Sequence, residues 1–313
     1  MSISGHVHTL GPAGAGPAGG SNRCAGSPRR RGRPLMAWSP RTALVTGASS
    51  GIGRGVALAL AKRGVSVVAV ARRGDRLDAL ASEAGADLIP LPLDLADEHQ
   101  VGGLADALAD RGLQVDLLIN NAGYACPGPI EAVPPAAIRR QFEVNLVGLI
   151  GITQAVLPPM RANGRGRIVN VSSVAGIVSL PFLGIYCASK FALEGLSDAL
   201  RLELRPFGID VLLVEPAAIA SDFANVTLVR SADTPEEHAY GRWYDPAGLH
   251  AGSEANAAPL ELAVSQVLRI ALAQRAVPRT IFPARGRRLA AMKRWLPARV
   301  MDGLLQRRFR LGD

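Results

Sequence analysis

The chain has 313 residues, 48% of them hydrophobic and 19% charged, and a formal net charge of +9. This length suffices for one large α/β domain or two small ones, and the apolar content supports a core. Three cysteines, Cys24, Cys126 and Cys187, are widely spaced and show no metal-ligand spacing. They exclude a disulfide scaffold, favour a reducing cytoplasm and predict no metal site.

The positive charge lies at the two ends of the chain. Residues 1–40 hold five arginines and no acidic residue, and residues 261–313 carry a net charge of +9. The body between them, residues 41–260, therefore carries −5. A body of this sign is a poor match for a polyanion, so we expect no nucleic-acid partner.

Residues 1–40 are rich in Gly, Pro, Ser and Arg without periodicity, which predicts a disordered basic tail. The N-terminus lacks the apolar core of a signal peptide, and no apolar run reaches the roughly eighteen residues of a spanning helix. We therefore expect a cytoplasmic protein. A start at Met36, just before the first strand, stays open as an alternative.

A phosphate-binding turn is expected near the start of the ordered body. The short apolar strand Thr42–Thr46 runs into the glycine-rich turn Thr46–Gly53, and a helical pattern follows at Val56–Lys62. Glycines let the backbone approach a pyrophosphate, and the start of a helix presents free N–H groups and a positive dipole end. These elements in this order predict a dinucleotide site.

The residues after the next strand indicate which dinucleotide binds. Val65–Val70 is an expected buried strand, and Ala71, Arg72 and Arg73 follow it. Folds that bind NAD place an acidic residue here for the ribose 2′-hydroxyl, whereas a guanidinium pairs with a 2′-phosphate. Arg72, with Arg54 as a second positive charge, predicts a preference for NADP(H), and NAD(H) is the second candidate. The alternative is that Arg72 and Arg73 only open a solvated helix.

Strands and helices continue to alternate along the body. This alternation predicts an α/β fold of the Rossmann type, a doubly wound parallel sheet in one three-layer α/β/α domain over residues 41–284. Further strands are expected at Leu88–Leu93, Val115–Ile119, Arg167–Ser172 and Ile209–Val214, and helices at Ala96–Arg111, from Pro134 towards Met160, and at Tyr186–Arg205.

The C-terminal third departs from this pattern. Periodicity is lost over about residues 217–258, directly after a strand end where ligands bind, so we expect a substrate lid. A helix is expected at Pro259–Ala273 and an edge strand at Arg279–Pro283. Residues 285–313 are basic with interleaved apolar residues, which predicts a helical, amphipathic C-terminal extension. We expect this extension to pack on the body of the protein or to form an oligomer contact. The alternative is peripheral contact with an anionic membrane.

Three residues of one stretch have the chemistry for an acid–base centre. Tyr186 and Lys190 are four apart and share one face of a helix, and Ser173 follows the expected strand Arg167–Ser172. A hydroxyl, a tyrosine and a lysine can converge there on one substrate oxygen. Asn145 lies in an apolar run, where a buried asparagine needs partners, and helix packing is its alternative role.

These motifs, in this order, resemble the classical short-chain dehydrogenase/reductase (SDR) family over residues 42 to about 283. Within this family, the sequence most resembles the branch that contains bacterial oxidoreductases, hydroxysteroid dehydrogenases and retinol dehydrogenases. The matching motifs are T-G-x-x-x-G-x-G at Thr46–Gly53, N-N-A-G at Asn120–Gly123, Asn145, Ser173, and Y-x-x-x-K at Tyr186–Lys190.

The resemblance implies an enzyme that transfers hydride between NADP(H) and an alcohol or carbonyl group of a lipophilic substrate. Tyr186 would be the general acid/base, with its pKa lowered by the Lys190 ammonium. Ser173 would hydrogen-bond the reacting oxygen, and Asn145 would hold a water that links Lys190 to solvent. Dimers or tetramers are common in the family, so a homodimer or homotetramer is expected.

The resemblance also implies a cofactor groove. One departure is Ala217, which stands where a glycine usually follows Pro216. The implied cofactor contacts are Gly47, Ser49, Ser50, Gly51, Ile52 and Gly53 at the pyrophosphate, Arg72 at the 2′-phosphate, Asp94 and Leu95 at adenine, Asn121, Ala122 and Gly123 along the groove, Tyr186 and Lys190 at the ribose, and Pro216, Ile219 and Ser221 near the carboxamide.

Two alternatives stay open. A 3-oxoacyl-[acyl-carrier-protein] reductase would suit the basic C-terminal region, because a carrier protein is acidic. A non-catalytic NADP-binding redox sensor is the second, but it would not need Asn145, Ser173, Tyr186 and Lys190 together.

Overall fold

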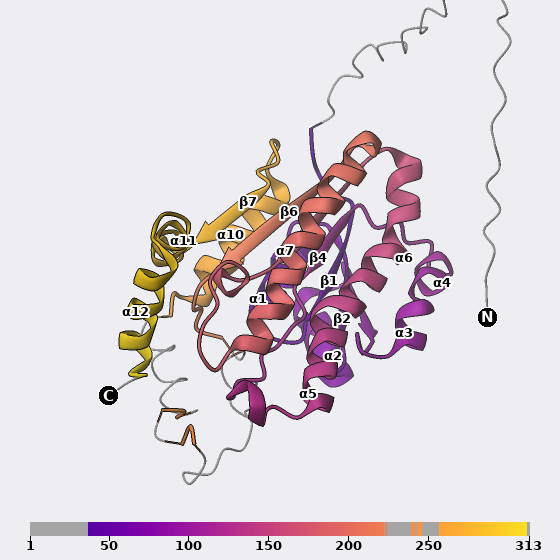
Figure 1. Ribbon diagram of the computed structural model, residues 1–313. Helices are drawn as coiled ribbons and strands as arrows, with labels where there is room; N and C mark the ends of the chain where they lie inside the picture. Colours follow the sequence, from indigo (N-terminus) through magenta and orange to yellow (C-terminus); the bar gives the residue numbers. More distant parts are fainter. Residues whose placement is uncertain (1–36, 222, 224–238, 242, 246–256, 312–313) are drawn as a thin grey trace, which may run out of the picture. The chain divides into compact units, whose positions relative to one another are not determined.

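The computed structural model describes residues 37–311, except 222, 224–238, 242 and 246–256 (Figure 1). Most of the predicted tail therefore lies outside the described residues. Its last residues belong to the body, because the Trp38 amide donates to the Gln274 side chain over 2.7 Å and the Trp38 indole donates to the Ala271 carbonyl. Order thus begins before Thr42.

The predicted doubly wound parallel sheet is confirmed. Seven strands pair in parallel in the order β3-β2-β1-β4-β5-β6-β7. The order reverses beside β1, so the carboxyl ends of β1 and β4 flank a crevice of the kind that binds ligands in open α/β sheets. The strands are β1 Thr42–Thr46, β2 Ser66–Ala71, β3 Leu88–Pro92, β4 Leu117–Asn120, β5 Gly166–Val171, β6 Ile209–Pro216 and β7 Arg279–Phe282.

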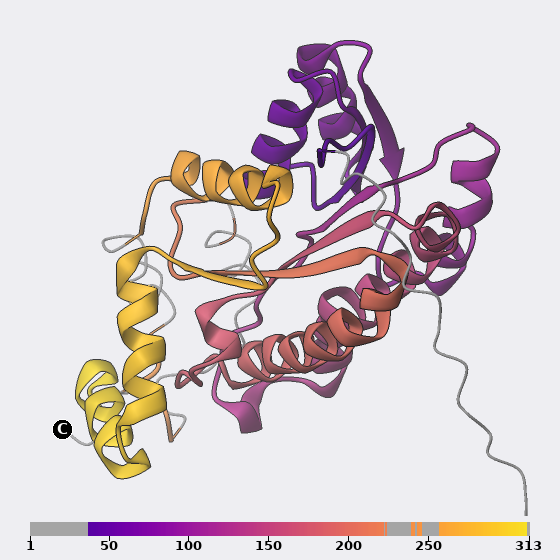
Figure 2. The same ribbon diagram turned by 90° about the horizontal axis from the view of Figure 1, so that it is seen from above.

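Helices cover both faces of the sheet (Figures 1 and 2). Alternate strand residues feed two apolar cores, so that Val45 belongs to one and Leu44 to the other. The core on one face includes α1 Gly51–Ala61, α2 Gly74–Ala84 and α10 Leu260–Leu272. The core on the other face includes α3 Glu98–Gly102, α4 Leu104–Ala109, α6 Gly148–Asn163 and α7 Gly184–Leu204.

The helix predicted at Ala96–Arg111 is two helices. The side chain of Asp97 caps α3 by accepting from the amides of His99 and Gln100. The glycines at 102 and 103 then separate α3 from α4, since glycine weakens a helix interior. The apolar residues of both helices still face the sheet.

A continuous helical run precedes β5. It consists of α5 Pro135–Phe142, one π-helical turn at Glu143–Val147 (η2) and α6. By length and composition alone, residues 135–163 are the one candidate for a membrane-crossing helix within the described parts of the chain. In α6, however, Ile152, Val156 and Met160 are buried against the sheet, as in the core helix of a folded domain.

The C-terminal extension is helical, as predicted. After β7 come α11 Ala284–Trp295 and α12 Ala298–Phe309, which lie beside each other (Figure 2). α11 is tied to the sheet's carboxyl edge. A Cβ added at Gly286 would lie 2.9 Å from Val174 and 3.3 Å from Ala217. Only a glycine lets α11 pack this closely on the two loops.

Candidate active site

The glycine-rich turn joins β1 to α1, and its glycines serve different purposes. A Cβ at Gly47 would lie 2.8 Å from Asn121 Nδ2, and one at Gly53 would lie 2.4 Å from the same atom. These two glycines make room for the loop after β4. A Cβ at Gly51 would make only an ordinary contact, 3.6 Å from Ser221 Cβ, but Gly51 has φ +54°, a conformation that glycine adopts without strain. The turn therefore depends on glycine for close packing at Gly47 and Gly53 and for backbone conformation at Gly51.

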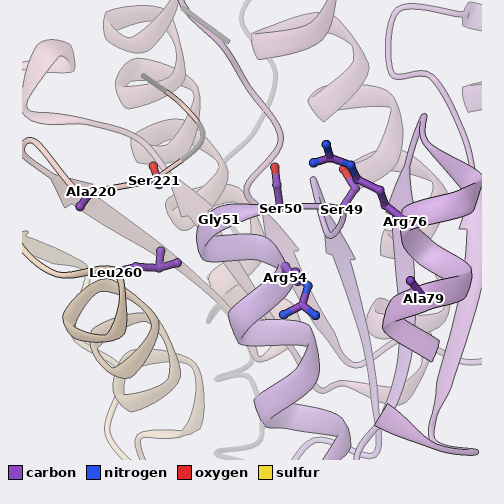
Figure 3. Close-up of a pocket in the computed structure, with 9 residues that line it drawn as sticks. All are labelled: Ser49, Ser50, Gly51, Arg54, Arg76, Ala79, Ala220, Ser221 and Leu260. Atoms are coloured by element: carbon purple, nitrogen blue, oxygen red, sulfur yellow. The ribbon is translucent and has the colours of Figure 1, made fainter. Parts of the chain in front are cut away.

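An open pocket of about 470 Å³ lies against this turn. Figure 3 shows the turn on one side and the loop after β6 on the other. The helix α1 starts here, and its N-cap Ser50 makes no side-chain capping bond. Its first amides are thus available to an anion such as a pyrophosphate. The lining residues are Ser49, Ser50, Gly51, Arg54, Arg76, Ala79, Ala220, Ser221 and Leu260.

Arginines lie around the glycine-rich turn, and Arg73 contacts it directly. Arg73 Nη2 donates to Ser49 Oγ over 2.9 Å and to Ser50 Oγ over 3.3 Å. Arg54 and Arg76 line the pocket, and Arg54 also pairs with Glu83 on α2. Arg72 is exposed, and neither Arg72 nor Arg73 is among the residues that line the pocket. A 2′-phosphate fits this basic site, with Arg73, Arg54 and Arg76 as the residues that would hold it, and the predicted role of Arg72 stays a prediction.

The N-N-A-G loop after β4 is fastened to β1. Thr46 Oγ1 accepts from the amides of Asn121 and Ala122, each over 3.0 Å. The Asn121 amide group donates to the Thr46 carbonyl over 3.1 Å. Asn121 thus fastens the end of β4 to the end of β1, and its predicted role in the cofactor groove stays a prediction.

The predicted adenine contacts have other partners. Asp94 pairs with Arg140 over 2.5 Å and also accepts from the Ala96 amide. Leu95 is buried in the core and touches Gly148 of α6. Their adenine role stays a prediction, and only the surface that these partners leave free can serve it.

The predicted acid–base residues meet at the carboxyl ends of β5 and β6. Ser173 caps the short 3₁₀ turn Val174–Gly176 (η3), with its Oγ accepting from the Ala175 amide. Tyr186 and Lys190 lie in the first turns of α7, and both are buried. Lys190 Nζ lies 5.9 Å from the centre of the Tyr186 ring and donates to the Val171 carbonyl over 2.9 Å.

The electrostatics of Tyr186 differ from the prediction. Burial raises the pKa of Tyr186 above its usual value, and a hydrogen bond with Ser173 only partly opposes this rise. The expected lowering of this pKa by Lys190 is therefore wrong for the protein alone, because desolvation outweighs a lysine that is engaged with a carbonyl. Burial also lowers the pKa of Lys190 to about 8, with Glu194 acting in the opposite direction.

Asn145 is fully buried in the π-helical turn η2, a distortion that often marks functional sites. Its Oδ1 accepts from the Tyr124 amide, and its Nδ2 donates to the Tyr124 carbonyl and to Ser189 Oγ. Ser189 in turn donates to the Tyr186 carbonyl over 2.8 Å. Asn145 thus fixes the loop after β4 against α7. The water-holding role that the sequence implied stays a prediction.

Sequence reasoning missed a carboxylate cluster behind Lys190. Glu194 on α7 and Glu215 on β6 both pair with Arg279 of β7. Burial and the neighbouring Glu194 raise the pKa of Glu215 to about 7, and Arg279 acts in the opposite direction. The spacing of Lys190 and Glu194 by one helical turn was the only signal in the sequence. The partners on β6 and β7 come together only in the fold.

Two pairs of aromatic rings are in contact in this region, and one of them includes Tyr186. The Phe223 and Tyr186 rings lie 5.7 Å apart, and the Tyr244 and Phe182 rings lie 5.1 Å apart. Phe223 and Tyr244 belong to the predicted lid, most of which lies outside the described residues. The two ends of that segment are joined by the Ala220 amide, which donates to the Ala258 carbonyl over 2.9 Å.

The three residues expected near the carboxamide lie on the same side of the groove. The Pro216 carbonyl accepts from Ser173 Oγ over 3.4 Å. Ile219 pairs with Ala258 in an isolated parallel bridge, and Ser221 lines the pocket. The alanine at 217 is accommodated, with its amide donating to the Phe282 carbonyl.

The family follows from comparison with known proteins. A model of the family described as short chain dehydrogenase matches residues 41–229. The chain belongs to the short-chain dehydrogenase family. It is an oxidoreductase of this family that acts on CH–OH donors with NAD(P)+ as acceptor.

Several curated relatives of this SDR cover much of its length. It is 36% identical to the uncharacterized oxidoreductase YbbO of Escherichia coli strain K12, over 85% of this chain and 94% of the relative. It is 39% identical to human retinol dehydrogenase 8, over 62% of this chain and 64% of the relative. It is 36% identical to 3-ketodihydrosphingosine reductase of Bacteroides thetaiotaomicron, over 59% of this chain and 66% of the relative.

Solved structures agree with the fold and include both cofactors. A short-chain dehydrogenase from Streptomyces avermitilis has a TM-score of 0.74 at 31% identity, over 88% of this chain and 100% of that chain. Serine dehydrogenase with NADP+ has a TM-score of 0.67 at 26% identity, over 77% of this chain and 94% of that chain. An SDR from Burkholderia phymatum with NAD has a TM-score of 0.72 at 28% identity, over 87% of this chain and 96% of that chain.

Proposed function

We propose that this SDR is a carbonyl reductase and alcohol dehydrogenase that prefers NADP(H), acts on a lipophilic substrate and uses Tyr186 as general acid/base. The observation that carries the proposal is the meeting of Tyr186, Ser173 and Lys190 beside an arginine-lined pocket. A bound nicotinamide cofactor supplies or accepts the hydride. All other functions fall to the chain's own residues.

Tyr186 donates the proton when a carbonyl is reduced. Its raised pKa keeps the phenol protonated at neutral pH, which a proton donor requires. Ser173 Oγ, hydrogen-bonded to that phenol, shares the substrate oxygen and orients it. Lys190 places a positive charge within 5.9 Å of the Tyr186 ring, which favours the phenolate that remains after the proton has left.

The surroundings of Tyr186 support a lipophilic substrate. Ala125, Ala175 and Cys187 form a buried apolar cluster with the tyrosine, and Leu180 and Leu183 pack against it. Two relatives have names that refer to long apolar molecules, retinol and 3-ketodihydrosphingosine. An apolar wall and aromatic residues above it suit a ketone or aldehyde on a hydrocarbon body.

The preference for NADP(H) rests on three arginines. Arg73 approaches the serines of the turn, and Arg54 and Arg76 line the pocket, so a doubly charged 2′-phosphate gains favourable contacts that a hydroxyl lacks. Single Gln variants of Arg72 and Arg73 test this assignment. We expect Arg73→Gln to lower kcat/KM for NADPH by at least about tenfold and to leave NADH turnover unchanged. If kcat/KM for NADPH falls only in the Arg72→Gln variant, then Arg72 binds the 2′-phosphate, as the sequence predicted.

Assembly and location complete the proposal. Val147, Phe191 and Leu202 are exposed apolar residues on the long helical segments of one face of the sheet. They support a homodimer or homotetramer, which light scattering with a Leu202→Glu variant tests, since a dissociated variant is expected. The proposed location is the cytoplasm, with the peripheral membrane contact argued below.

The substrate test is NADPH and NADH oxidation by the full chain against steroids, retinal, aryl ketones and 3-oxoacyl thioesters. Turnover of retinal or steroids with NADPH supports the proposal. Preference for the thioester would favour the alternative, a 3-oxoacyl-[acyl-carrier-protein] reductase, which the basic C-terminal helices suit. Tight NADPH binding without turnover of any compound would favour a redox sensor.

A further inference from the structure

The C-terminal helices α11 and α12 form a strongly basic surface. Over residues 284–311 the only acidic side chain is Asp302. Salt bridges with body carboxylates hold Arg279 in place just before α11. The exposed basic residues are Arg285, Arg287, Arg288, Lys293, Arg294, Arg299, Arg307, Arg308 and Arg310.

Helix α12 has two apolar stripes. Met301, Leu305 and Phe309, spaced by four, form the more covered stripe, and Met301 is buried. Val300 and Leu304, also spaced by four, form a second stripe and are 47% and 38% exposed. Helical spacing continues this outer stripe into Arg307 and Arg308. An apolar stripe that ends in cations is typical of a helix lying in a membrane interface.

Helix α11 adds an aromatic residue at the corner between the two helices. Trp295, its last residue, is 78% exposed. Ala291 and Arg288 precede it by four and seven residues and are exposed on the same helix face. Tryptophan favours the boundary between apolar and aqueous phases, where its ring is buried and its N–H stays hydrated.

This surface adjoins the catalytic loops. Gly286 at the start of α11 packs on Val174, the neighbour of Ser173, and on Ala217, the neighbour of Pro216. α11 and η3 are in contact accordingly. A membrane that receives the C-terminal helices would therefore lie near the side of the sheet where the substrate must enter.

We propose that α11 and α12 dock the protein onto anionic lipid bilayers, with Trp295, Val300 and Leu304 inserted at the headgroup boundary and the arginines on lipid phosphates. The net charge and the exposed apolar residues favour a lipid surface over a second copy of the chain, since two copies would bring these cations together. The docking proposal depends only on the features of α11 and α12. Its use in delivering a lipophilic substrate rests on the proposed function.

The experiment is sedimentation of the full chain with vesicles of phosphatidylcholine alone or with about one third phosphatidylglycerol. We expect binding to the anionic vesicles only, and release by high salt. Arg307→Gln/Arg308→Gln should weaken binding about thirtyfold, because each cation contributes about fivefold. Trp295→Ala should weaken it without changing its salt dependence.

Matched controls come from the amino-terminal ends of the strands, away from the carboxyl ends on which α11 packs. Arg63→Gln/Arg111→Gln removes two exposed arginines that donate to carbonyls of the helices just before them, and Val277→Ala trims an exposed valine before β7. These variants should bind like wild type. Equal binding of the wild type to neutral and anionic vesicles would overturn the proposal, and so would unchanged binding of the Arg307→Gln/Arg308→Gln variant. Dissociation of this variant from dimer to monomer would also overturn it, because α12 would then serve as a contact between copies of the chain. Turnover of a water-soluble ketone is measured in parallel, so loss of docking and loss of the enzyme reaction are distinguished.

Discussion

Two arginine-centred clusters lie at different places in the sheet and are built differently. Arg167, at the start of β5, is 2% exposed and donates to the carbonyls of Ala271 and Ala273 and to Asp210. Its guanidinium also stacks 4.5 Å from the Trp38 ring. Every interaction of this cation is favourable, and the cluster joins β5, β6, α10 and the start of the ordered chain.

The cluster around Arg279 carries excess negative charge. One guanidinium meets Glu194, Asp198 and Glu215, and Glu215 is fully buried. Glu194 Oε1 and Glu215 Oε2 are buried without a hydrogen-bond donor, and the charge of Glu194 helps to raise the pKa of Glu215. Protonation of Glu215 relieves the repulsion between the two carboxyl groups. Such a costly arrangement beside Lys190 indicates that this cluster serves activity, whereas Arg167 serves stability.

The largest effect is expected at the catalytic end. Tyr186→Phe removes the proton donor and keeps the ring that packs on Phe223. We expect kcat to fall at least about a thousandfold, roughly 4 kcal/mol in the barrier, with NADPH affinity retained. Steady-state kinetics and fluorescence titration measure both. Residual activity near that of wild type would remove Tyr186 from the mechanism.

At the other cluster, Arg167→Met should reduce stability and leave the chemistry intact. The variant loses the buried hydrogen bonds to two carbonyls and to Asp210, and we expect about 3 kcal/mol less free energy of unfolding. Urea denaturation measures the loss, and kcat per folded molecule is the control. A large change in kcat without a change in the urea midpoint would reverse the contrast between the clusters.

Glu215→Gln tests the excess charge. The folded-state pKa of about 7 lies above the ordinary value of 4.5, so the folded protein holds this proton more tightly than the unfolded chain. The stability contributed by the protonated form is complete below about pH 4.5 and is lost as the pH rises through 7. We expect the variant to lack this decline and to gain about 1 kcal/mol over wild type at pH 8, an amount discounted for screening by Arg279. Unfolding curves between pH 5 and 8 on both proteins provide the comparison.

What the sequence could predict follows the same division. The turn around Gly51 and the pair Tyr186 and Lys190 depend on neighbours a few residues away, so local pattern sufficed. Glu215 and Arg279 are 64 residues apart and meet through the pairing of β6 with β7, which no local pattern encodes. Arg72 and Arg73 are adjacent and chemically identical, and only the backbone path at the end of β2 turns Arg73 to the serines.

The tyrosine shows a further limit. The sequence predicted a pKa lowered by Lys190, because it gave the distance of one helical turn but not the burial of Tyr186 or the Val171 carbonyl that engages the lysine. Desolvation is a property of the packed core and outweighs a charge known only by its spacing.

The smallest expected effect links the carboxylate cluster to the active site. Burial gives Lys190 a pKa of about 8, and Glu194 holds it from falling further. The lysine charge that supports Tyr186 is therefore present below about pH 8 and is lost as the pH rises through that value. Glu194→Gln removes the nearby negative charge, so this loss of kcat should move to lower pH by about half a unit. Asp198→Asn also removes a carboxylate from Arg279, but Asp198 is not among the groups that shift the pKa of Lys190. The pH–rate profile of that control should stay in place, and an equal shift in both variants would assign the effect to Arg279 instead of to Glu194.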